Sequence, residues 1–409
     1  MPSRAAERVT ADWPFVLVGA LLVAVALVAN ELVLGAWLTI GGHVTNPASR
    51  LVLALIDVTA LAAGLVLIVR RHRAPWRQMV LSIAVTVITL ALAEGGLRLV
   101  FGVRSLFGPP DREIDAVLGW RPVANVALDR DMPGFGRVHY TTRTGGFRVF
   151  GDPSSTKLKV LVIGDSYTEA ATVSDGETYY ERFARIAPNV EIFAIGGGGY
   201  GTLQEYLQLD AWTDKIRPDL IIVQMHPNDL INNSHALESR STTDNNQMTR
   251  PYWEQGRAVS RFPENTAWGP LYNLVRHSYL LRLINVNVVF LRARAVGSVE
   301  HSADRDDADV KQATATTAEL LQLMRRRSGV PVAVFSVRPD QSSLWTVSEV
   351  CRDAGVIHIA GVGEAVEAAA AAGERVNGLP TDAHWNGRGH EIAAGVIAKW
   401  FTQGDWRGR

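Results

Sequence analysis

The 409-residue sequence contains a single cysteine, Cys351, and has no excess of either charge. One cysteine forms no disulfide within the chain and leaves a metal ion without a second thiolate ligand. Lysine plus arginine number 41, as do aspartate plus glutamate, whereas a nucleic-acid-binding domain shows a basic excess or a basic stripe. These shortages exclude a disulfide scaffold and a cysteine-rich metal site, and they predict that nucleic acid is not a partner.

Several common functional motifs are also missing. The glycine-rich stretch 194–202, "AIGGGGYGT", is not followed by Gly-Lys-Ser or Gly-Lys-Thr, which disfavours a phosphate-binding loop. No helix-spaced His-Glu-x-x-His pair is present, which disfavours a zinc protease. The chain also has no internal repeats. With 409 residues, the chain is long enough for more than one structural unit.

The first hundred residues hold three long apolar segments, at about 14–40, 51–69 and 79–101. Each approaches or exceeds the roughly 20 residues that cross a bilayer as a helix. A cleaved signal peptide is the competing interpretation of the first segment, but that segment is too long and two more follow it. The sequence therefore predicts a membrane anchor over residues 1–104 with three transmembrane helices, and a lipid bilayer as a partner.

The basic residues between these segments predict an orientation. The second connection, "RRHRAPWR", carries four arginines, whereas the first, "GGHVTNPAS", carries none. Short basic loops stay in the cytoplasm. We therefore expect a multi-pass protein of the cell (inner) membrane, with a cytoplasmic N-terminus and an extracytoplasmic or periplasmic catalytic domain. Glu31, Asp57 and Glu94 fall in or near the spans, and Glu94 is placed to pair with Arg98 four residues on, or to contact a membrane partner.

The rest of the chain has the pattern of an open α/β sheet. Residues 105–157 are rich in Gly, Pro and Arg and are expected to form a connector that packs on a catalytic domain over 158–409. Short, continuous apolar runs then alternate with helical stretches, which is typical of parallel strands buried on both faces. The expected strands are 158–163, 190–195, 219–225, 331–337 and 356–360. Residues 232–307 interrupt this alternation of strands and helices, and we interpret them as an insertion with a helix near 270–292.

Two of these expected strands end in motifs that suit catalysis. In open parallel sheets, ligands bind at the carboxyl ends of the strands. The first strand runs into "GDSYTEA", where Ser166 is either a nucleophile or, with Asp165, part of a helix cap. The second runs into "AIGGGGYGT", whose glycines allow backbone N–H groups to approach a ligand closely, or simply form a turn.

Two further motifs can complete a site of this kind. Asn228 in "MHPNDL" follows the third strand and is a candidate oxyanion donor, or the cap of a turn. The stretch "DAHWNGRGH" brings Asp382 and His384 together before the last helix, as in a general base oriented by a carboxylate. The alternatives are a metal site through Asp382, His384 and His390, or a simple helix cap. Together the four motifs supply what acyl transfer through a covalent intermediate needs.

With these motifs the chain resembles the SGNH (GDSL-type) hydrolase and acyltransferase superfamily, in a membrane-anchored form. The resemblance covers about 158–402 without the insertion, and "LGWRPVANV" and "TTRTGGFRV" resemble the lead-in of anchored members. It implies a flavodoxin-like three-layer α/β/α sandwich, a catalytic triad of Ser166, Asp382 and His384, and an oxyanion hole of Ser166, Gly199 and Asn228. His226 stands where the family usually has Gly, and one residue rather than two separates Asp382 from His384.

The function that the resemblance implies is an extracytoplasmic serine esterase acting on O-acyl groups, chiefly O-acetyl groups, of cell-envelope glycans. No metal or organic cofactor is expected. One alternative is an O-acyltransferase that moves acetyl to an envelope polysaccharide, with a membrane-bound O-acyltransferase or an envelope assembly complex as its partner. The other is a catalytically silent, glycan-binding module of a membrane complex.

Overall fold

The computed structural model describes most of the chain and divides it into two compact units. One unit comprises Met1–Gly108 with Pro270–Asn287, and the other comprises Pro109–Gly269 with Val288–Arg409. The described residues are 4–28, 47–69, 76–101, 111–132, 134–241, 244, 250–260, 278–281, 299, 304–340, 345–378, 383–404 and 406–407. Most of the predicted 270–292 helix lies outside these residues.

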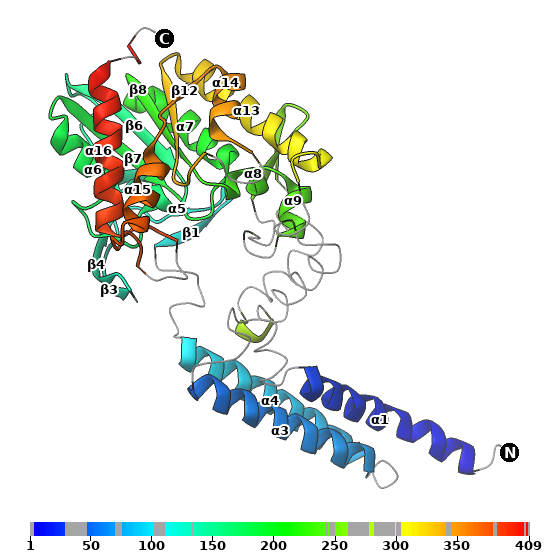
Figure 1. Ribbon diagram of the computed structural model, residues 1–409. Helices are drawn as coiled ribbons and strands as arrows, with labels where there is room; N and C mark the ends of the chain where they lie inside the picture. The colour runs from blue at the N-terminus through cyan, green and yellow to red at the C-terminus, as the bar shows by residue number, and fades with distance from the viewer. Residues whose placement is uncertain are drawn as a thin grey trace. The chain divides into compact units, whose positions relative to one another are not determined.

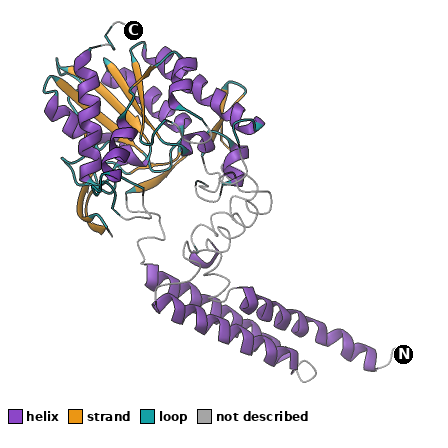
Figure 2. Cartoon of the chain, in the orientation of Figure 1, coloured by secondary structure: helices purple, strands orange, loops and turns teal. Residues whose placement is uncertain are grey.

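Three helices make up most of the first unit (Figures 1 and 2): α1 (Arg4–Val28), α3 (Pro47–Val69) and α4 (Trp76–Phe101). They coincide with the three apolar segments, but the prediction that they are transmembrane helices is wrong. Among the residues that the structure describes, no helix combines the length and the apolar character that a membrane crossing needs. The orientation and the extracytoplasmic location inferred from the arginines presupposed these spans and are withdrawn with them.

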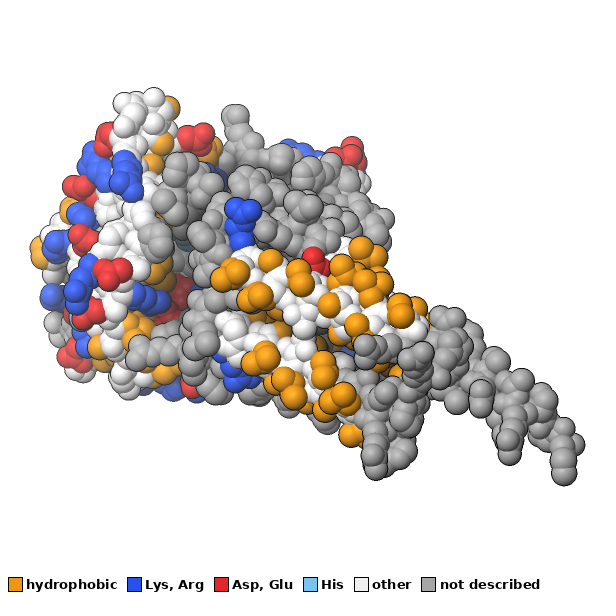
Figure 3. Space-filling view, turned by 90° about the horizontal axis from the view of Figure 1, so that it is seen from below, with side chains coloured by type: hydrophobic (Ala, Val, Ile, Leu, Met, Phe, Trp, Pro, Cys, Tyr) orange, Lys and Arg blue, Asp and Glu red, His pale blue; other side chains and the backbone are white. Residues whose placement is uncertain are grey.

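The reason lies in where the charged residues fall within the helices. The helix bounds place two or more charged residues inside each helix, and the longest stretches free of charge are 13–28, 58–69 and 78–93. Each of these is shorter than the roughly 20 residues that span the hydrocarbon core. Many apolar side chains of these helices are nevertheless exposed, as Figure 3 shows, among them Leu21, Val58 and Leu92.

Helices α1 and α3 of this unit make close backbone contact, and the Glu94 carboxylate of α4 forms several hydrogen bonds. A side chain at Gly19 of α1 would lie 2.8 Å from the Gly64 carbonyl oxygen of α3, and one at Gly64 would lie 2.7 Å from that of Gly19. Glycine at both positions therefore lets the two helices cross at van der Waals distance. On α4, Glu94 pairs with Arg98 as the spacing predicts, at 2.8 Å. The same carboxylate accepts the N–H groups of Tyr279 and Leu280, each at 3.0 Å.

The second unit is built on a six-stranded sheet with the order β12-β11-β8-β6-β7-β5. Five strands are parallel and match the predicted strands: β6 (Leu158–Gly164), β7 (Val190–Gly196), β8 (Leu220–Met225), β11 (Val332–Ser336) and β12 (Ile357–His358). The edge strand β5 (Val149–Phe150) pairs antiparallel with β7. The fold class is therefore corrected to an α/β fold with a mixed sheet, preceded, in the part of the chain that the structure describes, by helices that are not long and apolar enough to cross a membrane.

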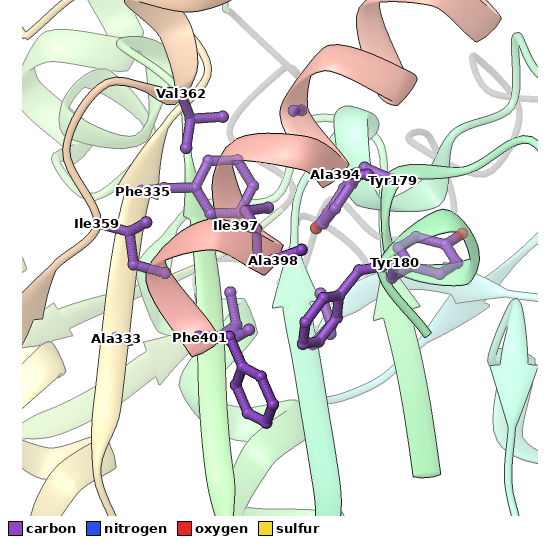
Figure 4. Close-up of a cluster of buried hydrophobic side chains, with 14 of the residues drawn as sticks. Tyr179, Tyr180, Ala333, Phe335, Ile359, Val362, Ala394, Ile397, Ala398 and Phe401 are labelled. Carbon is purple, nitrogen blue, oxygen red and sulfur yellow. The ribbon is translucent and has the colours of Figure 1, made fainter. Parts of the chain in front are cut away.

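Helices cover both faces of this sheet because its central strands are buried on both sides. Alternate residues of β6 point to opposite faces, so that Val160 and Val162 join one core while Leu161 and Ile163 join the other. The first core contains α6 (Tyr179–Ile186), α15 (Val362–Ala371) and α16 (Gly387–Gln403), and Figure 4 shows part of it. The second contains α7 (Thr202–Ile216), α13 (Ala308–Ser328) and α14 (Val347–Ala354).

The remaining elements surround the carboxyl edge of the sheet, which the register defines. Gly164 pairs with Gly196, and Met225 with Ser336, so β6, β7, β8 and β11 end at one edge. Three short helices begin near that edge: α5 (Ser166–Glu169), α8 (Asn228–Asn232) and α9 (His235–Arg240). Three hairpins and a 3-10 turn complete the unit: β1 (Arg112–Asp115) with β2 (Gly119–Pro122), β3 (Ala127–Met132) with β4 (Gly136–Thr141), β9 (Pro251–Glu254) with β10 (Arg257–Ser260), and η3 (Thr144–Gly146).

Candidate active site

The serine of "GDSYTEA" lies where strand β6 turns into helix α5. Asp165 is the residue that caps this helix, because its Oδ1 atom accepts the backbone N–H of Tyr167 at 3.0 Å. Ser166, the first residue of the helix, directs its hydroxyl elsewhere. The two interpretations of the motif thus belong to two different residues: Asp165 is the cap, and Ser166 is available for chemistry.

The Ser166 hydroxyl meets His384, which is 218 residues away in the chain. The Oγ atom of Ser166 lies 2.8 Å from Nε2 of His384, a hydrogen-bond distance. His384 comes from the short segment before α16. Asn386 caps that helix by accepting the N–H groups of Arg388 and Gly389. The cap fixes where the helix begins and, with it, the segment that carries His384.

The aromatic ring of Tyr167 supports the histidine of this pair. Its centroid lies 5.0 Å from that of His384 and 5.0 Å from that of Trp385. Its hydroxyl donates to the Ala383 carbonyl oxygen at 2.7 Å. Because Tyr167 is buried and directly follows Ser166, it links the nucleophile helix to the His384 segment. Sequence reasoning missed this role, although an aromatic residue next to the serine was visible in the motif.

His226 and Asn228 form a second pair next to Tyr167. The ring of His226 stacks on that of Tyr167, with centroids 5.6 Å apart and an angle of 23° between the planes. Nδ1 of His226 lies 2.8 Å from Oδ1 of Asn228. The same Nδ1 atom lies 3.2 Å from the backbone nitrogen of Asn228. With a proton on Nδ1, His226 donates to Oδ1 of Asn228, whereas in the other tautomer Nδ1 accepts the Asn228 backbone N–H. In the first tautomer the amide hydrogens on Nδ2 of Asn228 remain for another acceptor.

The glycine-rich loop after β7 lies against the nucleophile helix. The Gly197 N–H donates to the Gly164 carbonyl oxygen at 3.3 Å, and a side chain at Gly196 would collide with the backbone of Asp165 and Glu169. Gly199 has a φ of +76°, a left-handed conformation that favours glycine. The loop therefore passes close to Ser166, as an oxyanion loop has to.

Not every predicted site residue can be placed. The structure brings Ser166 and His384 together, connects Asn228 to them through His226 and Tyr167, and puts the loop of Gly199 beside α5. Asp382, the predicted orienting carboxylate, lies outside the described residues. Its role in the triad and that of Gly199 in the oxyanion hole stay predictions.

His390, a candidate metal ligand in the sequence, is a buried residue of the first core. Its Nδ1 atom accepts the backbone N–H of Tyr179 at 3.2 Å, and its ring lies parallel to that of Tyr179. Burial, together with the nearby positive charges of Arg148 and Arg182, lowers the pKa of His390 to about 3. His390 is therefore neutral at neutral pH and acts as a packing residue with a satisfied acceptor.

A buried acidic cluster lies beneath the site. Asp165, Glu205 and Asp229 are fully buried, and Asp229 accepts the His226 N–H at 2.7 Å. Burial raises the pKa of Glu205, and the nearby carboxylates of Asp229 and Asp165 raise it further. Burial and Asp165 likewise raise the pKa of Asp229. The raised pKa values favour the protonated, neutral forms of Glu205 and Asp229.

Comparison with known proteins identifies a family for this chain. Residues 160–395 match the model of the GDSL-like Lipase/Acylhydrolase family, which is more than half of the chain. The chain belongs to this family. Like the motifs, the matched range begins in β6, just before Ser166, and ends in α16, just after His384.

Two solved structures are similar to part of this chain. A member of the lipolytic protein G-D-S-L family from Veillonella parvula DSM 2008 is 15% identical, covers 60% of this chain and 98% of its own, and gives a TM-score of 0.35. A catalytic mutant of the acetylxylan esterase Axe2 from Geobacillus stearothermophilus is 10% identical, covers 60% of this chain and 94% of its own, and gives a TM-score of 0.33.

One curated protein shares a shorter region with this GDSL-family chain. It is the probable cytokinin riboside 5'-monophosphate phosphoribohydrolase LOG4 of Oryza sativa subsp. japonica, 36% identical over 102 residues. The match covers 25% of this chain and spans 39% of the length of that relative.

Proposed function

We propose that this GDSL-family chain is a serine ester hydrolase that removes O-acyl groups, chiefly acetyl groups, from a glycan or another alcohol ester through an acyl-serine intermediate. The observation that carries the proposal is the 2.8 Å contact between Ser166 Oγ and His384 Nε2. A serine hydroxyl is a weak nucleophile unless a base lies within hydrogen-bond reach of it. Family membership supports an acylhydrolase reaction at this pair.

The first half of the proposed reaction forms the acyl-enzyme. Oγ of Ser166 attacks the ester carbonyl carbon while Nε2 of His384 accepts the hydroxyl proton. The N–H groups of Ser166 and Gly199 and the side-chain amide of Asn228 stabilise the negative oxygen of the tetrahedral intermediate. Collapse of this intermediate breaks the bond to the alcohol, which leaves with the proton from His384.

The second half releases the acid. Water gives a proton to His384 and attacks the acyl carbon, and Ser166 leaves with that proton returned. Asp382 is proposed to hold His384 in the required tautomer. The Asp-x-His-Trp form of residues 382–385 resembles that of some envelope polysaccharide O-acetyltransferases of the SGNH superfamily, and it also occurs in members presumed to be hydrolases. It is therefore compatible with acetyl as the acyl group in either reaction.

The decisive experiment uses the purified full chain and its Ser166→Ala variant. We expect the wild type to hydrolyse an aryl acetate and to be labelled by a fluorophosphonate, and the variant to do neither. Ser154→Ala, which changes an exposed serine of a loop, is the matched control and should behave like wild type. Equal labelling of wild type and Ser166→Ala would show that Ser166 is not the nucleophile.

The same assay separates hydrolysis from transfer. An acetylated oligosaccharide and an unacetylated sugar acceptor are supplied together, and the products are identified by mass spectrometry. Release of free acetate supports the hydrolase, whereas acetyl on the acceptor supports the O-acyltransferase alternative. A wild type without labelling or turnover supports the silent binding module instead.

The oxyanion donor is tested separately with Asn228→Ala. Loss of one such donor typically lowers kcat about 100- to 1000-fold. Asn189→Ala, at an exposed turn, provides the control. If Asn228→Ala turns over the aryl acetate as fast as this control, Asn228 does not stabilise the oxyanion.

A further inference from the structure

Two segments outside the sheet hold the backbone of the glycine loop. The indole N–H of Trp120, in β2, donates to the Gly198 carbonyl oxygen at 3.2 Å. The guanidinium of Arg250, just before β9, donates to the next carbonyl oxygen, that of Gly199, at 2.7 Å. The first segment belongs to the predicted connector and the second to the predicted insertion. Both therefore reach the same turn of the candidate oxyanion loop.

The bond from Trp120 matters because of the geometry of the peptide unit. The Gly198 carbonyl and the Gly199 N–H belong to one planar, trans peptide, so fixing one fixes the direction of the other. The Gly199 N–H donates to no described residue. We propose that Trp120 is a positioning residue that aims the Gly199 N–H into the oxyanion hole. This inference rests on the proposed function.

Residues on both strands of the β1–β2 hairpin, which carries the Trp120 indole, form polar contacts with the site. Arg112 contacts Glu169 through two nitrogens, at 2.8 and 3.3 Å, and Glu169 is the last residue of the helix that Ser166 begins. The Tyr200 hydroxyl donates to the Trp120 carbonyl oxygen at 2.8 Å. The hairpin thus ties the nucleophile helix and the oxyanion turn to each other. Such rigidity is what makes oxyanion stabilisation effective, because the donors need no reorganisation during the reaction.

The turn at Gly198 is closely packed by neighbouring side chains. A side chain at Gly198 would collide with the guanidinium of Arg112 and the carboxylate of Glu169. Arg250 is fully buried, its Nε lies 2.7 Å from Oε2 of Glu238, and its guanidinium carbon lies 5.1 Å from the centre of the Trp120 ring. The guanidinium therefore lies over the indole and packs it against the turn.

The experiment compares Trp120→Phe with Trp406→Phe in the full chain. Trp406 is a matched control, because its buried indole also donates to a backbone carbonyl oxygen, that of Phe401, at 3.1 Å. Turnover of an aryl acetate is measured per active site titrated with a fluorophosphonate, so that unfolded molecules do not count. Inhibition by phenylboronic acid, which forms a tetrahedral adduct on the serine, is measured alongside.

We expect Trp120→Phe to lower kcat about 10-fold or more with KM nearly unchanged, since only the transition state uses the Gly199 N–H. The affinity for phenylboronic acid should fall by a similar factor, and Trp406→Phe should match wild type. A kcat for Trp120→Phe equal to that of Trp406→Phe would overturn the inference alone. A lower melting temperature of Trp120→Phe with an unchanged kcat per titrated site would also overturn it, because Trp120 would then contribute to stability alone. A wild type that is not labelled at Ser166 would overturn the proposed function and, with it, this inference.

Discussion

The Nε2 atom of His384 lies within hydrogen-bond distance of the Ser166 hydroxyl, at 2.8 Å, although 218 positions separate the two residues. The contact joins the carboxyl end of β6 to the amino end of α16, so it exists only when the whole sheet is assembled. It also makes the proposed reaction testable by single substitutions on either side.

Replacing His384 by alanine removes the proposed general base. We expect kcat for an aryl acetate to fall at least about 1000-fold, because the serine hydroxyl then keeps its proton. The rate of fluorophosphonate labelling at Ser166 should fall as well. His358→Ala, on the edge strand β12, is the control for loss of a histidine. A His384→Ala variant within about 10-fold of that control would contradict the assignment.

Tyr167→Phe tests whether the tyrosine positions His384. The variant loses only the hydroxyl that holds the Ala383 carbonyl oxygen, and it keeps the ring contacts. We expect a loss of about 1 kcal/mol in the free energy of unfolding. We also expect kcat to fall a few-fold. Tyr180→Phe loses a similar buried bond, to the Thr168 carbonyl oxygen at 3.1 Å, and should cost stability but less activity. If the two variants lose kcat equally, Tyr167 has no special role.

Buried His390 is expected to make the free energy of unfolding depend on pH below pH 6.5. The pKa of His390 is lowered from 6.5 to about 3 in the folded chain, so below pH 6.5 the unfolded chain binds a proton that the folded chain refuses. The free energy of unfolding should therefore fall as the pH drops from 6.5 towards 3, by an amount on the order of 4 kcal/mol.

His390→Gln should flatten this dependence, since glutamine offers an acceptor to the Tyr179 N–H without titrating. Urea unfolding at several values of pH between 4 and 7 measures it, with exposed His139→Gln as the control. The explanation fails if wild type and His390→Gln lose stability in parallel as the pH falls.

Glu205 makes stability depend on pH in the opposite direction. Its folded-state pKa is raised above the ordinary value of 4.5, so above that pH the folded chain retains a proton that the unfolded chain has lost. The free energy of unfolding then falls as the pH rises from 4.5 to the folded-state pKa. Glu205→Gln should raise the melting temperature at pH 8 and change it less at pH 4.5. Exposed Glu319→Gln in α13 is the control, and a lower melting temperature of Glu205→Gln at pH 8 would refute the prediction.

The strands could be predicted because their signal is local. A run such as "LKVLVI" is apolar on both faces, and only a strand covered on both sides buries it, so the five parallel strands lie where expected. The two-residue strand β5 was missed, because Val149 and Phe150 become a strand only by pairing with β7.

The membrane prediction failed for a different reason. The apolar segments were measured without knowing the helix limits, and the helices contain charges that shorten each apolar stretch.

By itself the sequence determined the residue types of the site and their order along the chain: a serine after one strand, glycines after the next, an asparagine after a third and a histidine before the last helix. Their spacing along parallel strands also implied that they meet at one edge. Only the tertiary structure decided that Asp165 caps the helix while Ser166 faces His384. It also decided that Tyr167, Trp120 and Arg250 donate hydrogen bonds to the backbone carbonyl oxygens of Ala383, Gly198 and Gly199. The physical reason is that hydrogen bonds between residues far apart in the chain depend on distances that no local pattern contains.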